Sequence, residues 1–110
     1  MTDRRIVITG IGVISPLGND LASTWEAMKA GRSGIDTIKS MDVSDYSTKI
    51  AGEVKDFDPT PYFRTPKDAR RVDRFTHFAM GAAGMALKDS GMDLEAVDKT
   101  RIGVMVGSGI

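Results

Sequence analysis

Two short apolar runs constrain the fold of this chain more than any other feature. Residues 5–13 and 102–106 carry aliphatic side chains at most positions, with no polar alternation between successive residues. A strand of this kind is buried on both faces, which occurs mainly in parallel sheets covered by helices on both sides. The two runs therefore predict an α/β fold in which they are neighbouring parallel strands of one buried sheet, joined by right-handed crossovers.

Helical periodicity follows the first run. Asn19 can cap a helix in which Leu21, Trp25 and Met28 fall on one face, and Gly31 ends it. A longer helical pattern runs over residues 66–90, with a break or bend expected near residues 71–73. Residues 33–47 lack any period and are expected to form a loop, whereas residues 49–55 alternate as in a short strand with one solvated face.

The middle of the long helix contains Gly81 and Gly84 on either side of two alanines. Each glycine costs about 1 kcal/mol relative to alanine in a helix, so another segment is expected to approach closely there. About three strands and two substantial helices are too few to cover strands that are apolar on both faces. We therefore expect the chain to be incomplete on its own and to belong to a larger protein.

Composition excludes several classes of function. Fifteen basic residues balance fifteen acidic ones, so nucleic acid or an anionic membrane is not an expected partner. The chain has no cysteine and one histidine, His77, which excludes a disulfide framework, a cysteine nucleophile and a multi-histidine metal site within these residues. No apolar stretch is long enough to span a bilayer, and a soluble, cytoplasmic location is expected. No cofactor and no metal are expected.

Two glycine-rich turns follow the apolar runs. Gly10 and Gly12 suggest a dinucleotide fingerprint, but Ser15 stands where a third glycine is needed and Pro16 lacks a backbone donor. A tight strand exit is the preferred interpretation, and a nucleotide-binding α/β module remains an alternative. The turn at residues 107–109 lacks the spacing of a nucleophile elbow, and close backbone packing at a strand end is expected there.

The segment between residues 64 and 74 is strongly basic in an otherwise neutral chain. Its five basic residues are Arg64, Lys67, Arg70, Arg71 and Arg74. Against two acidic residues, Asp68 and Asp73, these give a local net charge of five minus two, or +3. In a continuous helix, four of them would share one face, which indicates either an acidic protein partner or a solvated, internally paired surface.

Four motifs in order resemble the opening of the 3-oxoacyl-[acyl-carrier-protein] synthase II family. They are the stretches at residues 4–18, 23–25, 31–35 and 101–110. The resemblance covers the whole chain, but only about the first quarter of such an enzyme. It implies a thiolase-like fold, a layered α/β structure with a mostly parallel buried sheet, of which residues 1–110 form the N-terminal segment.

The resemblance also implies an activity and its partners. These enzymes are homodimers that condense malonyl-carrier protein, with loss of carbon dioxide, with an acyl chain bound to a cysteine. The cysteine, two histidines and a lysine that perform this reaction would all lie beyond Ile110, so no catalytic residue is expected here and the chain alone should be inactive. A polyketide ketosynthase is the nearest alternative.

Two sets of residues correspond to functional positions of that family. Lys67, Arg70 and Arg71 match the basic segment that receives the acidic acyl carrier protein, although Pro66 departs from the family pattern. Ile110 matches an isoleucine that lines the acyl pocket near the dimer interface. A self-contained domain that docks an acidic protein through the same basic segment is a third hypothesis.

Overall fold

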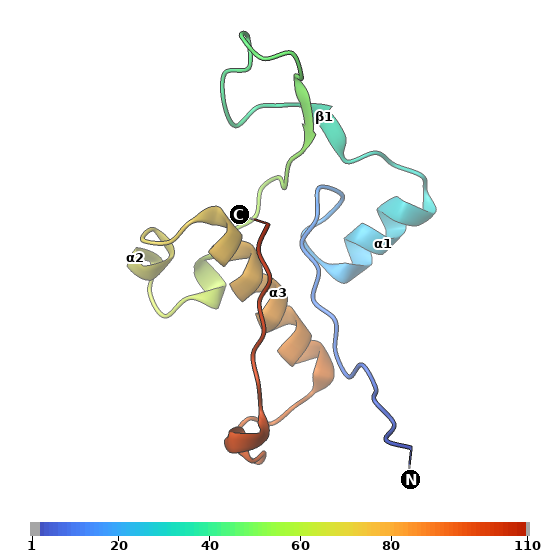
Figure 1. Cartoon of the computed structure of the whole chain (residues 1–110), viewed down its shortest axis with the longest axis vertical. Helices are drawn as coiled ribbons and strands as arrows, with labels where there is room; N and C mark the ends of the chain where they lie inside the picture. Colours follow the sequence, from blue (N-terminus) through green and yellow to red (C-terminus); the bar gives the residue numbers. More distant parts are fainter. Residues whose placement is uncertain (1–2, 110) are drawn as a thin grey trace. The chain divides into compact units, whose positions relative to one another are not determined.

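The computed structural model describes residues 3–109, and the chain divides into two units. One unit is Val13–Asp58, and the other combines Met1–Gly12 with Pro59–Ile110. The first unit contains α1 (Leu21–Lys29), β1 (Ile35–Thr37) and β2 (Ile50–Gly52). The second contains η1 (Thr60–Tyr62), α2 (Pro66–Ala69), α3 (Arg74–Ser90) and η2 (Lys99–Arg101), as labelled or coloured in Figure 1.

A tight turn precedes α1, and Asp20 caps the helix. Ser15 and Gly18 exchange two backbone hydrogen bonds of 2.9 and 3.2 Å across the turn. The Asp20 carboxylate accepts the Ser23 amide proton at 2.7 Å, satisfying one of the free donors of the first helical turn. The expectation that Asn19 is the cap is therefore wrong, because its side-chain amide instead donates to the Lys55 carbonyl at 2.7 Å.

The cap makes α1 sensitive to acid. Hydrogen bonds from the backbone and side chain of Ser23 hold the pKa of Asp20 below its ordinary value of 3.8. A lowered folded-state pKa means that the contribution to stability is present above about pH 4 and is lost as the pH falls through the folded-state pKa. We expect hydrogen exchange at the Ser23 amide to lose protection below pH 4, and Asp20→Asn, which keeps a cap oxygen, to remove this pH dependence. An equal pH dependence in both proteins would contradict the assignment.

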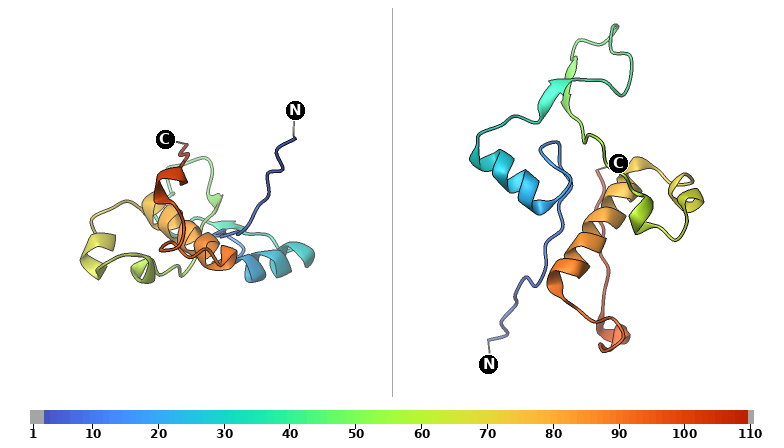
Figure 2. Two further views of the ribbon diagram at one scale, coloured as in Figure 1. Left: turned by 90° about the horizontal axis from the view of Figure 1, so that it is seen from below. Right: turned by 180° about the vertical axis from the view of Figure 1, so that it is seen from behind.

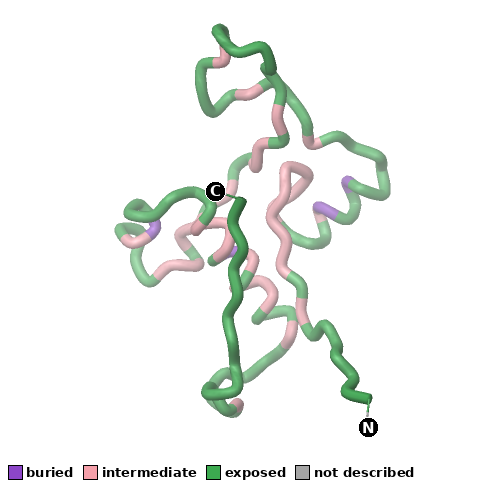
Figure 3. Tube along the Cα trace, viewed as in Figure 1, coloured by how far each residue is buried: buried purple, intermediate pink, exposed green. Residues whose placement is uncertain are grey.

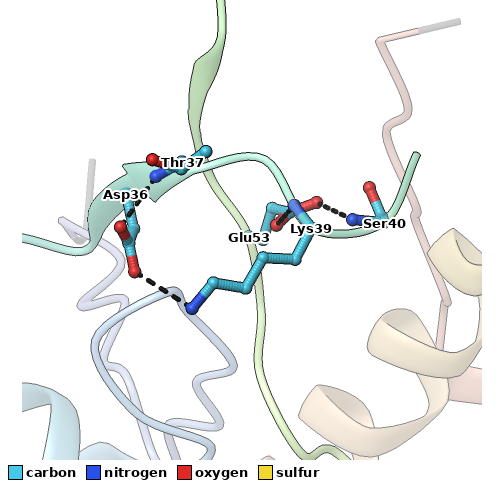
Figure 4. A network of polar contacts seen from close by, with 5 residues as sticks. All are labelled: Asp36, Thr37, Lys39, Ser40 and Glu53. Atoms are coloured by element: carbon cyan, nitrogen blue, oxygen red, sulfur yellow. Dashed lines mark hydrogen bonds and ion pairs between the residues drawn. The ribbon is translucent and has the colours of Figure 1, made fainter. Parts of the chain in front are cut away.

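β1 and β2 form an antiparallel hairpin, with Ile35 opposite Gly52 and Thr37 opposite Ile50. β2 confirms the predicted short strand, but β1 lies in the region expected to be a loop. Glu53 holds the connection after β1, since its two carboxylate oxygens accept the amide protons of Lys39 at 2.8 Å and Ser40 at 3.2 Å (Figure 4). Glu53 lies more than a dozen residues from Lys39 and Ser40 in the sequence, so local periodicity could not predict this contact.

The apolar face predicted for α1 is exposed. Trp25 is 54% exposed and Leu21 is 42% exposed, and together with Ala22 they line a shallow apolar hollow on the helix surface. The buried positions of this helix are Thr24 and Ala27 instead. The Thr24 hydroxyl lies between the Gly18 carbonyl at 3.2 Å and the Ser15 hydroxyl at 3.0 Å, which explains how a polar side chain is tolerated there.

The long helical pattern is divided as expected. α2 begins with Pro66 and ends at Ala69, the chain then turns, and α3 starts at Arg74. The Thr65 hydroxyl caps α2 by accepting the Asp68 amide proton at 3.2 Å. α3 ends at Ser90, and its C-cap Gly91 has a φ of 63°, the left-handed conformation that glycine adopts at little cost.

The prediction of a close approach to α3 is confirmed. Gly81 is buried, and a Cβ added to Gly84 would come within 2.7 Å of the Tyr62 ring. A Cβ added to Gly12 would overlap the backbone carbonyl of Ala82, so the N-terminal segment lies directly against the helix backbone. The Ile11 amide also donates to the Asp89 carboxylate at 2.9 Å, which ties this segment to α3.

The predicted parallel sheet is absent from the described chain. Residues 5–13 and 102–106 form no strand; Ile6 is 89% exposed and Met105 is 97% exposed. The exposure is visible along the C-terminal segment in Figure 3. A strand needs hydrogen-bonding neighbours on its edges, and the only ladder among residues 3–109 is the β1–β2 hairpin. Among the same residues, no helix is both long and apolar enough to cross a membrane.

Candidate functional site

The basic segment, defined here as residues 64–74, is the candidate site. Its five basic residues are all exposed. Lys67 lies in α2, Arg70 is the C-terminal cap of that helix, Arg71 lies in the turn and Arg74 is the first residue of α3. They therefore do not share one face of a continuous helix, because the break after Ala69 interrupts the helical spacing. The short helix that carries Lys67 is labelled in Figure 1 and coloured yellow in both views of Figure 2.

The cations of the basic segment differ in their surroundings. The Arg74 guanidinium lies 5.2 Å from the centre of the Phe78 ring, a cation–π contact along α3. Among residues 3–109, Lys67, Arg70 and Arg71 take part in no ion pair, unlike Lys29 with Glu26, Lys39 with Asp36 and Lys99 with Glu95. These three charges are presented to solvent without a partner in the described chain.

The two carboxylates within the basic segment do not neutralise these charges through ion pairs. Asp68 accepts the Thr65 hydroxyl proton at 2.9 Å, so its carboxylate is engaged in the cap of α2. Asp73 precedes α3, where a negative charge is favourable near the helix N-terminus. For Lys67, Arg70 and Arg71, the described contacts thus do not support the interpretation as an internally paired surface, and these three cations remain exposed.

His77 connects the basic segment to α3. Its Nε2 atom lies 2.7 Å from the Ala69 carbonyl oxygen, and its ring meets Phe63 edge-on, with centroids 5.7 Å apart and planes at 85°. The observed contact spans the turn between α2 and α3, so helical spacing could not reveal it.

The two glycine-rich turns have different surroundings. Cβ atoms on Gly10 and Gly12 would overlap carbonyl groups of α3, so both glycines pack directly against the backbone of that helix. Gly107 and Gly109 have open space around them, so the close packing expected at residues 107–109 is not found. Ile110 lies outside the described residues. Within residues 3–109, no group of three or more acidic residues or histidines is placed to hold a metal ion.

Comparison with known proteins identifies the family. The model of the N-terminal domain of beta-ketoacyl synthases matches residues 3–110. This chain belongs to the beta-ketoacyl synthase family. It is 46% identical to the 3-oxoacyl-[acyl-carrier-protein] synthase 2 of Vibrio harveyi and of Coxiella burnetii, each over 110 residues. It is also 46% identical to the protein of that name in Staphylococcus aureus, over 108 residues, or 98% of this chain.

The ketosynthase relatives are much longer than this chain. All of the chain is matched to the Vibrio and Coxiella proteins, yet it spans only 26% of their length. A solved structure described as the ishigamide ketosynthase/chain length factor is also similar, with a TM-score of 0.71 and 34% sequence identity. That match covers 81% of this chain and 22% of the other, and it supports the N-terminal part of a thiolase-like ketosynthase fold.

Proposed function

We propose that this chain is the N-terminal part of a 3-oxoacyl-[acyl-carrier-protein] synthase of the second type, which lengthens fatty acyl chains by two carbons. The observation that carries the proposal is the 46% identity across the whole chain to relatives from several bacteria that share this name. The polyketide alternative is supported by the ishigamide ketosynthase, at the lower identity of 34%. The fatty acid reaction is therefore the favoured one.

The residues that perform the condensation would lie in the remainder of the enzyme, outside this chain. An acyl group is held as a thioester of a cysteine, and malonyl-carrier protein loses carbon dioxide to give a carbanion equivalent. This carbon attacks the acyl carbonyl, and the cysteine thiolate leaves as the new carbon–carbon bond forms. The chain has no cysteine, so the nucleophile must come from other residues, and the family resemblance implies the same for the two histidines that stabilise the developing negative charges.

The contribution of this chain is a docking surface for the acyl carrier protein. Lys67, Arg70 and Arg71 are exposed and have no ion-pair partner in the described chain, which suits an acidic partner that supplies the missing counter-charges. Unpaired charges also raise the local positive potential, so they accelerate encounter with an anionic protein. The charges and their exposure support a role in docking an acidic protein. The resemblance to the family implies that this protein is the acyl carrier protein.

The remaining features of the proposal concern the complete enzyme. The exposed apolar residues 5–13 and 102–106 would become strands of a mostly parallel sheet once neighbouring strands cover their edges and helices cover their faces. Ile110 would line the acyl pocket, and the enzyme would be a cytoplasmic homodimer without a cofactor. The large apolar exposure of Ile6, Val104 and Met105 supports the covering by further protein.

The proposal is tested by reconstituting the reaction with a full-length synthase that carries this chain. With an acyl donor and malonyl-carrier protein, mass spectrometry should detect a 3-oxoacyl-carrier protein two carbons longer than the acyl donor. The 110-residue chain by itself should form no product, because it lacks a cysteine. Product formation by the isolated chain, or a full-length protein that binds carrier protein without extending the acyl chain, would overturn the proposal.

A further inference from the structure

We propose that His77 is a positioning residue that holds the basic segment in the geometry in which it docks the carrier protein. This inference rests on the docking role proposed above. His77 is not itself part of the exposed charge cluster, since its side chain is partly buried between α3 and the residues that flank α2. Its effect on docking would be exerted through the backbone that carries the cations.

The hydrogen bond of His77 acts on the peptide group next to Arg70. Ala69 is the last residue of α2 and is only 3% exposed, so its carbonyl has neither a further helical turn nor ready access to water. Because a carbonyl oxygen only accepts, Nε2 must carry the proton that is donated across the 2.7 Å contact. The N–H of the same peptide group belongs to Arg70 and donates to the Pro66 carbonyl at 3.3 Å. Both sides of this peptide group are thereby restrained.

The ring of His77 also contacts the residue that leads into α2. Phe63 is the C-cap of η1 and meets the imidazole edge-on, so the His77 side chain contacts both the residues before α2 and the last residue of α2. Lys67 lies between these two contacts, and Arg70 and Arg71 follow the second directly. One side chain on α3 thus restrains both ends of the part of the chain that presents Lys67, and its second contact directly precedes Arg70 and Arg71.

The helix α2 needs a restraint from another part of the chain, because it is too short to be stable by itself. The helix has four residues, far fewer than the about 12 to 15 that an isolated helix needs to be even marginally stable in water. The adjacent cations Arg70 and Arg71 repel each other and have no ion-pair partner within residues 3–109. Anchoring this turn to α3 orders the cations before the partner arrives, which reduces the entropy lost on binding.

The test compares His77→Gln with His77→Asn and His77→Leu in the full-length synthase. Glutamine places an N–H donor the same number of bonds from the backbone as Nε2, asparagine places it one bond short, and leucine removes it. We expect His77→Asn and His77→Leu to raise the apparent KM for carrier-linked substrate about three- to tenfold, as loss of one hydrogen bond implies. His77→Gln should restore most of the wild-type value, and kcat with a carrier-free thioester should stay unchanged in all three.

The outcomes separate this inference from the docking proposal. If asparagine and glutamine behave alike, or if carrier-free activity falls as much as carrier-linked activity, the positioning role is wrong. If His77→Leu does not fold, the comparison of carrier-linked KM between His77→Gln and His77→Asn still tests the positioning role. If reversing the charges of Arg70 and Arg71 has no effect on carrier-linked KM, the docking surface itself is wrong. A clear effect of that reversal with none from His77→Asn would reject only the role of His77.

Discussion

Reversing two charges, with Arg70→Glu and Arg71→Glu together, should raise the apparent KM of the full-length synthase for acyl-carrier protein about tenfold or more. Each exposed ion pair contributes only about 0.2 to 1 kcal/mol, so removing one should have little effect. Reversal also turns attraction into repulsion, and the two changes together should cost on the order of 1 to 3 kcal/mol. Most of this loss should appear as slower association, measured by stopped-flow kinetics.

The docking prediction has two controls. A small acyl thioester without carrier protein should react nearly as fast with the variant as with the wild type, since it does not use the surface. Arg32→Glu with Lys55→Glu changes the total charge equally, at exposed cations that also lack ion pairs in the described chain, and should leave carrier KM almost unchanged. Added salt should weaken the wild-type interaction more than that of the variant. Equal losses with carrier-linked and carrier-free substrates would show that the basic segment is structural.

Introducing a methyl group at Gly12 should destabilise the full-length synthase by about 3 kcal/mol or more, because overpacking here involves backbone rather than flexible side chains. A Cβ at this position would overlap the Ala82 carbonyl and come within 2.8 Å of the Ala86 amide nitrogen. Neither backbone atom can rotate away, so α3 or the N-terminal segment must move. Chemical unfolding of Gly12→Ala should show a lower midpoint with an unchanged slope.

A glycine in open surroundings provides the control for Gly12. Gly31 has a φ of 63° and nothing within 4 Å of an added Cβ, and asparagine tolerates this left-handed conformation better than most residues. Gly31→Asn should therefore cost less than about 1 kcal/mol. If Gly12→Ala and Gly31→Asn destabilise the protein equally, the close approach of Gly12 to α3 is not the cause of the destabilisation.

Patterns within short stretches of sequence were reliable where one segment decides its own conformation. The helical periods of α1 and α3, the break before Arg74 and the glycine at the end of α3 all follow from propensities that act over a few residues. The basic segment could be recognised because its charges are adjacent in the chain. The glycines of α3 indicated that some segment approaches the helix, but not that it is residues 10–12 and Tyr62.

The sequence by itself thus determined the family, the helices and the charged residues of the candidate docking surface. Each of these depends on neighbouring residues or on motifs of fixed spacing. Only the tertiary structure decided which groups meet: Glu53 with the amides after β1, His77 with the end of α2, and Gly12 with the backbone of α3. It also showed the two apolar runs without strand partners. A strand and a hydrogen bond between distant residues both require a second segment, and an apolar pattern specifies the need for that segment without identifying it.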